Sequence, residues 1–219
     1  MKRIFLLLNV LFLCSHLGAV ENATKYYDMG KSYYQDNRID DAIRSWKKAI
    51  RINSRYADAY NSLGDAYWKR GYLEQASKEY QLATRYKRGF ARAHHNLGII
   101  YSQEGNWNGA IYEYKNALQY KPNSAITHHN LGNVYAQTCQ LDLAIYEWKQ
   151  AIRYNCNLAK ARYNLGIAYL EKGRLPEAIR ELKSVLSNNY SKELTQKACQ
   201  QLSKMEIGKT DDSIAKSCE

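Results

Sequence analysis

The sequence predicts an all-α solenoid, a stack of repeated helix pairs, and three observations support this prediction. A glycine recurs at one constant interval along the chain, apolar positions fall at helical spacing twice within each interval, and the 219 residues include only two Pro. Twenty Tyr stand against three Phe, which favours many half-exposed packing sites where a ring is buried and its hydroxyl stays polar. A hydrophobic fraction of 45% excludes a chain that is disordered throughout, and the few prolines and glycines exclude collagen-like and low-complexity classes.

The first 19 residues are expected to be a targeting segment, outside the fold. Met1 to Arg3 is basic, and Ile4 to Leu13 is an apolar run too short for a comfortable membrane span. Leu17 to Ala19 is a cleavage site with a small residue at the cut and a less usual Leu two residues before it. This layout is typical of a secretory signal peptide, so export is expected. Two alternatives stay open. Cys14 follows a run similar to a bacterial lipobox and would carry a lipid, or the segment would remain as an N-terminal membrane anchor.

Columns of identical residues predict five consecutive repeats. The glycine column consists of Gly30, Gly64, Gly98, Gly132 and Gly166. The alanine column, twelve residues later in each case, consists of Ala42, Ala76, Ala110, Ala144 and Ala178. The repeats cover residues 23–56, 57–90, 91–124, 125–158 and 159–192. Small residues at fixed positions indicate places where neighbouring helices approach closely.

Each repeat is expected to contain two helices joined by a turn. In the third repeat, Leu97 and Ile100 lie on the apolar face of the first helix, and Tyr114 lies on that of the second. The large side chain four residues after each column alanine is expected to fill the gap between successive repeats. The turn position that usually holds a left-handed glycine holds Asn37 in the first repeat and Cys139 in the fourth; Asn tolerates that conformation better than Cys.

The repeats are expected to end in a capping helix over residues 193–205. Leu194, Ala198 and Leu202 form one apolar stripe, and polar residues replace the glycine and tyrosine columns on the other side. A solenoid needs a terminal element with a polar outer face, which this helix would supply. Residues 206–219 are expected to be a disordered tail.

The columns resemble the tetratricopeptide repeat (TPR), a helix–turn–helix unit of about 34 residues, and the resemblance extends over residues 23–192. It implies that the repeats coil into a right-handed superhelix whose first helices line a concave groove. It also implies that the groove binds a protein partner, as an extended peptide or as a helix.

An asparagine column, two residues before the glycine in the third, fourth and fifth repeats, gives the candidate binding residues; Asp28 and Ser62 stand there in the first two repeats. An Asn side chain both donates and accepts, so a ladder of them can pair with a peptide backbone, similar to the asparagine ladder of O-linked GlcNAc transferase. The alternative is that these amides bond between neighbouring helices. The residues predicted to contact a peptide are Asn61, His95, Asn96, His129, Asn130, Asn133, Tyr163 and Asn164.

No metal or cofactor is predicted. His95 and His129 would face the groove from adjacent repeats, about 10 Å apart as packed helices are, which opposes a shared metal with ligand distances of about 2 Å. The thiols are expected to be isolated. Cys139 and Cys156 would lie about 20 Å apart at opposite ends of one helix, and Cys199 would be buried.

No enzyme is predicted, because the sequence lacks a Gly-rich phosphate loop, a Ser-His-Asp arrangement and a paired acidic motif. The net charge of +11 arises in part from basic residues in the last turns of second helices, where they complement the helix dipole, so no specific nucleic acid partner is expected. The sequence therefore favours an exported scaffold for protein–protein interaction. The alternative is a bacterial envelope assembly factor similar to the TPR lipoproteins of pilus or outer-membrane biogenesis, attached to a membrane through its N-terminus. The partner and the oligomeric state stay open.

Overall fold

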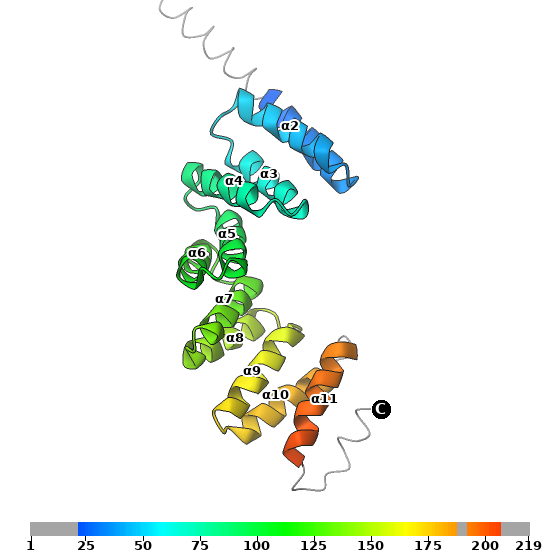
Figure 1. Cartoon of the computed structure of the whole chain (residues 1–219), viewed down its shortest axis with the longest axis vertical. Coiled ribbons are helices and arrows are strands. Elements are labelled where there is room, and N and C mark those ends of the chain that lie inside the picture. The colour runs from blue at the N-terminus through cyan, green and yellow to red at the C-terminus, as the bar shows by residue number, and fades with distance from the viewer. Residues whose placement is uncertain (1–21, 188–191, 207–219) are drawn as a thin grey trace, which may run out of the picture. The chain divides into compact units, whose positions relative to one another are not determined.

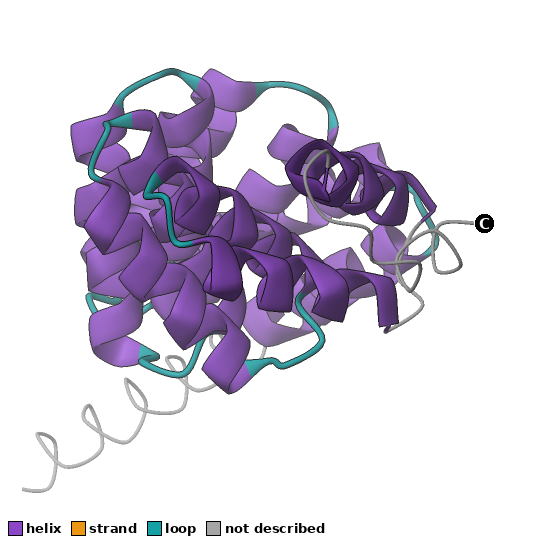
Figure 2. Cartoon of the chain, turned by 90° about the horizontal axis from the view of Figure 1, so that it is seen from below, coloured by secondary structure: helices purple, strands orange, loops and turns teal. Residues whose placement is uncertain are grey.

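The computed structural model describes residues 22–187 and 192–206, so the expected signal peptide and residues 207–219 of the expected tail lie outside the described residues. Every regular element in these ranges is a helix (Figure 2). None of the described helices is long and apolar enough to cross a membrane. The chain divides into two compact parts after Ile100, and each part is described by itself. We call residues 22–100 the N-terminal part, and residues 101–187 and 192–206 the C-terminal part.

The N-terminal part is built from helix pairs in chain order (Figure 1). A helix over residues 22–35 is followed by α2 (Ile39–Ile52), α3 (Ala57–Lys69), α4 (Leu73–Tyr86) and α5 (Ala91–Gln103), which extends past Ile100. Ala42 and Trp46 of α2 pack against Leu63 and Ala66 of α3 in one buried cluster. Adjacent repeats are thus joined by apolar side chains spaced one helical turn apart.

The C-terminal part continues the same alternation and ends in the capping helix. Its helices are α6 (Trp107–Tyr120), α7 (Ala125–Gln137), α8 (Leu141–Tyr154), α9 (Ala159–Glu171), α10 (Leu175–Ser187) and α11 (Lys192–Glu206). The last of these extends one residue beyond the expected capping helix at each end. Ala198 and Leu202 of α11 are buried with Leu182 and Val185 of α10, and Leu194 packs beside them, as the apolar stripe predicts.

The glycine and alanine columns mark where the two helices of a repeat touch. The column alanines, from Ala42 to Ala178, have no exposed surface. A Cβ atom added to Gly64 would lie 2.6 Å from the Tyr80 ring, and one added to Gly132 would lie 2.7 Å from Trp148 Nε1. Gly30 with Trp46 and Gly166 with Leu182 repeat this close approach. Each large side chain therefore packs on the glycine of its own repeat. Trp46 also packs against Leu63 and Ala66 of the next repeat, as expected.

The turn inside each repeat contains one residue in the left-handed backbone region. The φ angles are 60° at Asn37, 80° at Gly71, 72° at Gly105, 58° at Cys139 and 69° at Gly173, one position in each repeat. The two departures from glycine thus adopt the same turn conformation as the glycines. For a residue with a Cβ, such as Cys139, this conformation costs about 1–2 kcal/mol.

The cysteines differ from expectation at one position. Cys139 and Cys156 are exposed and free, as expected. Cys199 of α11 is 9% exposed, also as expected, but it is disulfide-bonded. The expectation that the thiols are isolated is therefore wrong for Cys199.

Candidate functional site

In the N-terminal part, a nearly buried carboxylate collects polar side chains from three helices. Asp65 of α3 accepts hydrogen bonds from Asn61 Nδ2 at 3.3 Å, from the Tyr80 hydroxyl at 2.8 Å and from Asn96 Nδ2 at 2.9 Å, and it forms an ion pair with Arg92. We call these five residues the Asp65 cluster. Burial raises the pKa of Asp65, although Arg92 and the Tyr80 hydroxyl favour its charged form. The hydrogen bonds and the ion pair of this cluster connect α4 and α5 to α3.

The same arrangement recurs in the C-terminal part around a neutral amide. Asn133 of α7 stands two periods after Asp65, and its Oδ1 accepts from Trp148 Nε1 at 3.0 Å and from Asn164 Nδ2 at 2.9 Å. Its Nδ2 lies 3.2 Å from His129 Nε2. We call these four residues the Asn133 cluster. An amide needs no counter-ion, and no arginine takes part in this cluster.

The asparagine column is therefore engaged between helices. Asn96 donates to the Asp65 cluster and Asn164 to the Asn133 cluster, while Asn130 bonds to the hydroxyl of Tyr114. Burial raises the pKa of Tyr114 to about 12, against the smaller opposing effects of its hydrogen bonds. Two of these amides also have an unused acceptor: within the described residues, Oδ1 of Asn96 and Oδ1 of Asn164 have no hydrogen-bond partner.

A pocket of about 700 Å³ opens beside the Asn133 cluster, and we call it the Asn164 pocket. Three of the predicted contact residues line it: Asn133, Tyr163 and Asn164. Its other lining residues are Ala136, Gln137, Leu141, Trp148, Ile167, Ala168, Leu170, Glu171 and Gln201. The volume lies within the usual range of ligand pockets, and the lining mixes apolar side chains with amides, as binding sites do.

Two predicted contact residues are buried. Asn61 is 1% exposed and His129 is 6% exposed, so neither presents a surface to a peptide. Burial, aided by Lys160, lowers the pKa of His129 to about 4, which keeps this side chain neutral. His95 is half-buried and interacts within the protein. Peptide contact at the predicted positions stays a prediction. In the part of the chain that the structure describes, no group of three or more His, Cys, Asp or Glu is placed to hold a metal ion.

A separate column ties each repeat to the loop before it. The side chain bonds to the main-chain carbonyl six residues earlier, at 3.2, 2.9, 2.9 and 3.2 Å for Tyr60, His94, His128 and Arg162. We call this the loop-tie column. Its members differ in chemistry but make the same bond, so this position requires a long side chain that can donate a hydrogen bond.

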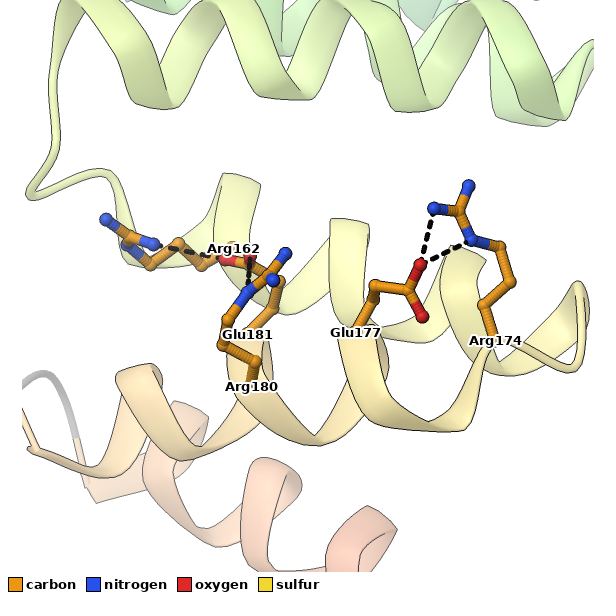
Figure 3. A network of polar contacts seen from close by, with 5 residues as sticks. All are labelled: Arg162, Arg174, Glu177, Arg180 and Glu181. Atoms are coloured by element: carbon orange, nitrogen blue, oxygen red, sulfur yellow. Dashed lines mark hydrogen bonds and ion pairs between the residues drawn. The ribbon is translucent and has the colours of Figure 1, made fainter.

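In the C-terminal part, the loop-tie column also contacts a glutamate on the second helix. His128 Nδ1 lies 2.6 Å from Glu147 Oε2, and Arg162 donates to Glu181 at 3.1 Å; Figure 3 shows the latter pair with Arg180 beside it. Both ring nitrogens of His128 therefore face acceptors, which requires the doubly protonated imidazolium. Burial alone would lower the pKa of His128, but its bonds to Glu147 and to the Pro122 carbonyl raise it above the ordinary value.

Comparison with known sequences decides the family. The family model described as TPR repeat matches residues 30–71, 64–105, 100–138 and 140–173, and the one described as Tetratricopeptide repeat matches residues 160–192. The chain belongs to the tetratricopeptide repeat family. The expected fold class, an all-α TPR solenoid, is confirmed. No curated protein matches the chain.

Solved TPR structures share this fold. Pseudomonas aeruginosa pilF has a TM-score of 0.75 at 19% identity and covers 91% of this chain and 90% of its own. YrrB, described as a TPR protein with an unusual peptide-binding site, has a TM-score of 0.70 at 20% identity over 84% and 93%. MamA has a TM-score of 0.68 at 23% identity over 78% and 97%. At these identities the likeness shows the fold alone.

Several residues of these TPR sites were not among the predicted contacts, and three of them stand in informative repeat columns. Asp65 stands two periods before Asn133, Gln201 stands two periods after it, and Glu171 follows Gln137 by one period. The repeat period itself was the signal that could have found them. Gln201 shows that the capping helix also contributes to the pocket.

Proposed function

We propose that this TPR protein is an exported, non-enzymatic scaffold that binds an extended peptide or a helix of a protein partner along the first helices of its repeats. The Asn164 pocket carries the proposal. It is bordered by the first helices α7 and α9 and by α11, and it joins apolar surface to amides with unused hydrogen-bonding groups. The likeness to YrrB, described as having a peptide-binding site, supports a peptide as the ligand.

The orientation of Asn164 suits a peptide backbone. One of its N–H groups is held by Asn133, which fixes the amide plane before any ligand arrives. Its Oδ1 and second N–H can then pair with one backbone N–H and one backbone carbonyl of an extended chain. A fixed amide loses little conformational entropy on binding, so it contributes more affinity than a mobile one would.

Site-specific photocrosslinking in native cells tests the proposal. A photoreactive residue replaces Ile167, which lines the Asn164 pocket, and in a control protein replaces Tyr146, which is 56% exposed on α8 and does not line the pocket. We expect a discrete protein adduct from position 167 that is absent from position 146. Equal adducts from both positions, or adducts from position 146 alone, would exclude the Asn164 pocket as the binding surface.

Export is the second element of the proposal. The signal-like layout of residues 1–19 supports it, and so does the disulfide at Cys199, because disulfides persist in oxidising compartments. Mass spectrometry of the purified protein is expected to find a mature N-terminus at Val20. An intact Met1 in the cytosol would contradict export.

An envelope assembly factor held to a membrane through its N-terminus is the alternative role. The fold-level likeness to Pseudomonas aeruginosa pilF motivates it, together with the lipobox-like run before Cys14. Metabolic labelling with a fatty acid distinguishes the two roles. Label on the wild type that disappears in a Cys14→Ser variant would favour the alternative, whereas a freely soluble, unlabelled protein would exclude lipid attachment.

A further inference from the structure

The Asn164 pocket differs in charge from the chain as a whole. The sequence carries a formal charge of +11, yet the lining of the pocket includes one acidic side chain, Glu171, and no basic one. Net charge governs long-range attraction, while a side chain inside a pocket is selected by the groups it touches. The chemistry of the bound residue therefore has to be read from the pocket.

The carboxylate of Glu171 is available to a ligand. Glu171 is exposed at the end of α9 and takes part in no hydrogen bond or ion pair with residues 22–187 or 192–206. The adjacent base, Lys172, is paired with Asp142 instead. Of the other nearby bases, Lys160 lies close enough to His129 and Glu193 to affect their titration, and Lys197 is paired with Glu193. None of these bases lines the pocket.

The remaining polar groups of the pocket add acceptors around that carboxylate. Asn164 Oδ1 is unpaired, and the amides of Gln137 and Gln201 have no hydrogen-bond partner among the described residues. Ile167 and Leu170 supply aliphatic surface, which suits the methylene stem of a long side chain. A guanidinium has five donors in one plane and also stacks on aromatic rings, such as that of Tyr163.

We propose that the Asn164 pocket receives a basic side chain, Arg in preference to Lys, from an extended peptide segment of the partner, with Glu171 as its counter-ion. This inference rests on the proposed peptide-binding function and names the chemistry that the site selects. The repeat column that holds Trp68 in the second repeat holds the smaller Ala136 in the fourth, where it lines the pocket. The column of Glu171 holds Lys69 in the second repeat, so the selected charge belongs to this repeat and not to the family fold.

Selection from a displayed library of random peptides, with the purified chain as bait, tests the inference. The wild type is expected to enrich Arg, and Lys to a lesser degree, at one position of the selected peptides. A Glu171→Gln variant is expected to lose the enrichment and to bind the wild-type Arg peptides about tenfold more weakly, the loss of one charge-assisted hydrogen bond. A Glu171→Lys variant is expected to select acidic residues at that position.

Two control variants separate the inference from the function on which it rests. Glu104→Gln removes an exposed carboxylate from a turn in the same part of the chain and should leave the Arg enrichment unchanged. Ala136→Trp copies Trp68 into the pocket and should abolish selection while the helical circular dichroism is retained. Peptides selected without a basic preference, or with one that Glu171→Gln does not alter, would overturn the inference and leave peptide binding intact. If Ala136→Trp selects every peptide that the wild type selects, the proposed function fails, and the inference fails with it.

Discussion

Two histidines that are adjacent in the chain should titrate in opposite directions. His128 faces an acceptor with each ring nitrogen, and its bonds to Glu147 and the Pro122 carbonyl outweigh the effect of burial and raise its pKa. His129 is buried, its Nδ1 has no partner among the described residues, and its pKa is lowered to about 4. The ordinary value for both is about 6.5. One residue of the pair is therefore charged near neutral pH and the other is not.

The two shifts have opposite consequences for stability. The folded state binds the His128 proton more tightly than the unfolded chain does, so this contribution is complete below about pH 6.5 and is lost as the pH rises through the raised pKa. For His129 the folded-state pKa is depressed, so its contribution is complete above about pH 6.5 and is lost as the pH falls towards 4. Stability should therefore fall on both sides of a maximum near neutral pH.

The size of the alkaline loss follows from the burial of the pair. The side chains of His128 and Glu147 are 11% and 12% exposed, so solvent screens their bond weakly. A hydrogen bond to a charged group contributes about 1.5–3 kcal/mol, far more than an exposed ion pair. A loss of about 2 kcal/mol lowers the melting temperature of a chain of this length by roughly 4–8 °C.

The assay is an NMR titration of the imidazole ring protons, followed by thermal melts across the same pH range. A His128→Arg variant is the control, because Arg162 makes both corresponding bonds in the next repeat, at 3.2 Å to Cys156 O and 3.1 Å to Glu181. This variant should remain folded and lose the alkaline decline in melting temperature. The reasoning is refuted if His128 titrates at or below the ordinary value, or if His128→Arg keeps the alkaline decline.

Three further substitutions follow from the packing. Cys139→Gly should stabilise the chain by about 0.5–1 kcal/mol in denaturant unfolding, because it removes the cost of a left-handed Cys, whereas Cys139→Ala keeps the Cβ and should not stabilise. Gly132→Ala should destabilise by about 1–3 kcal/mol, because its Cβ would lie 2.7 Å from Trp148 Nε1, and an unchanged midpoint would show that the ring moves freely. Asp65→Asn keeps an acceptor, as Asn133 does in its own cluster, whereas Asp65→Leu leaves buried donors unpaired. The Asn variant should therefore be about 1–3 kcal/mol more stable than the Leu variant. Equal stability of the two would mean that the Asp65 cluster contributes nothing to the free energy of unfolding.

The sequence predicted the fold because the fold depends on small residues at fixed intervals. A Cβ at Gly64 would meet the Tyr80 ring, and the left-handed turn returns in every repeat, whether it holds Gly105 or Cys139. Such constraints act within one repeat and recur in each, so the period exposes them. The disulfide at Cys199 was not predictable in this way, because disulfide pairing depends on proximity in space, which the period of 34 residues does not report.

The candidate site was only partly predictable, because the direction of a side chain depends on its contacts with the neighbouring repeat. The asparagine column was identified, but its period is equally compatible with a peptide ladder and with bonds between helices. The structure forms the second kind of bond from Asn96 to Asp65 and from Asn164 to Asn133. The acceptors of those bonds stand in a column that also holds Ile99 and Ile167, so in the sequence it resembles an ordinary variable position.

In the proposed binding mode, departures from the repeat, more than the repeat itself, determine which partner residue is selected. Five copies of one helix pair would present five equivalent surfaces, and no partner residue would be distinguished among them. Ala136 stands where the second repeat has Trp68, and Glu171 stands where the other repeats have Gln or Lys; both line the pocket of about 700 Å³. Neither change alters the glycine, alanine or turn columns. We therefore expect the variants at positions 136 and 171 to change peptide selection without changing the unfolding midpoint, and a change in both would show that binding and stability depend on the same columns.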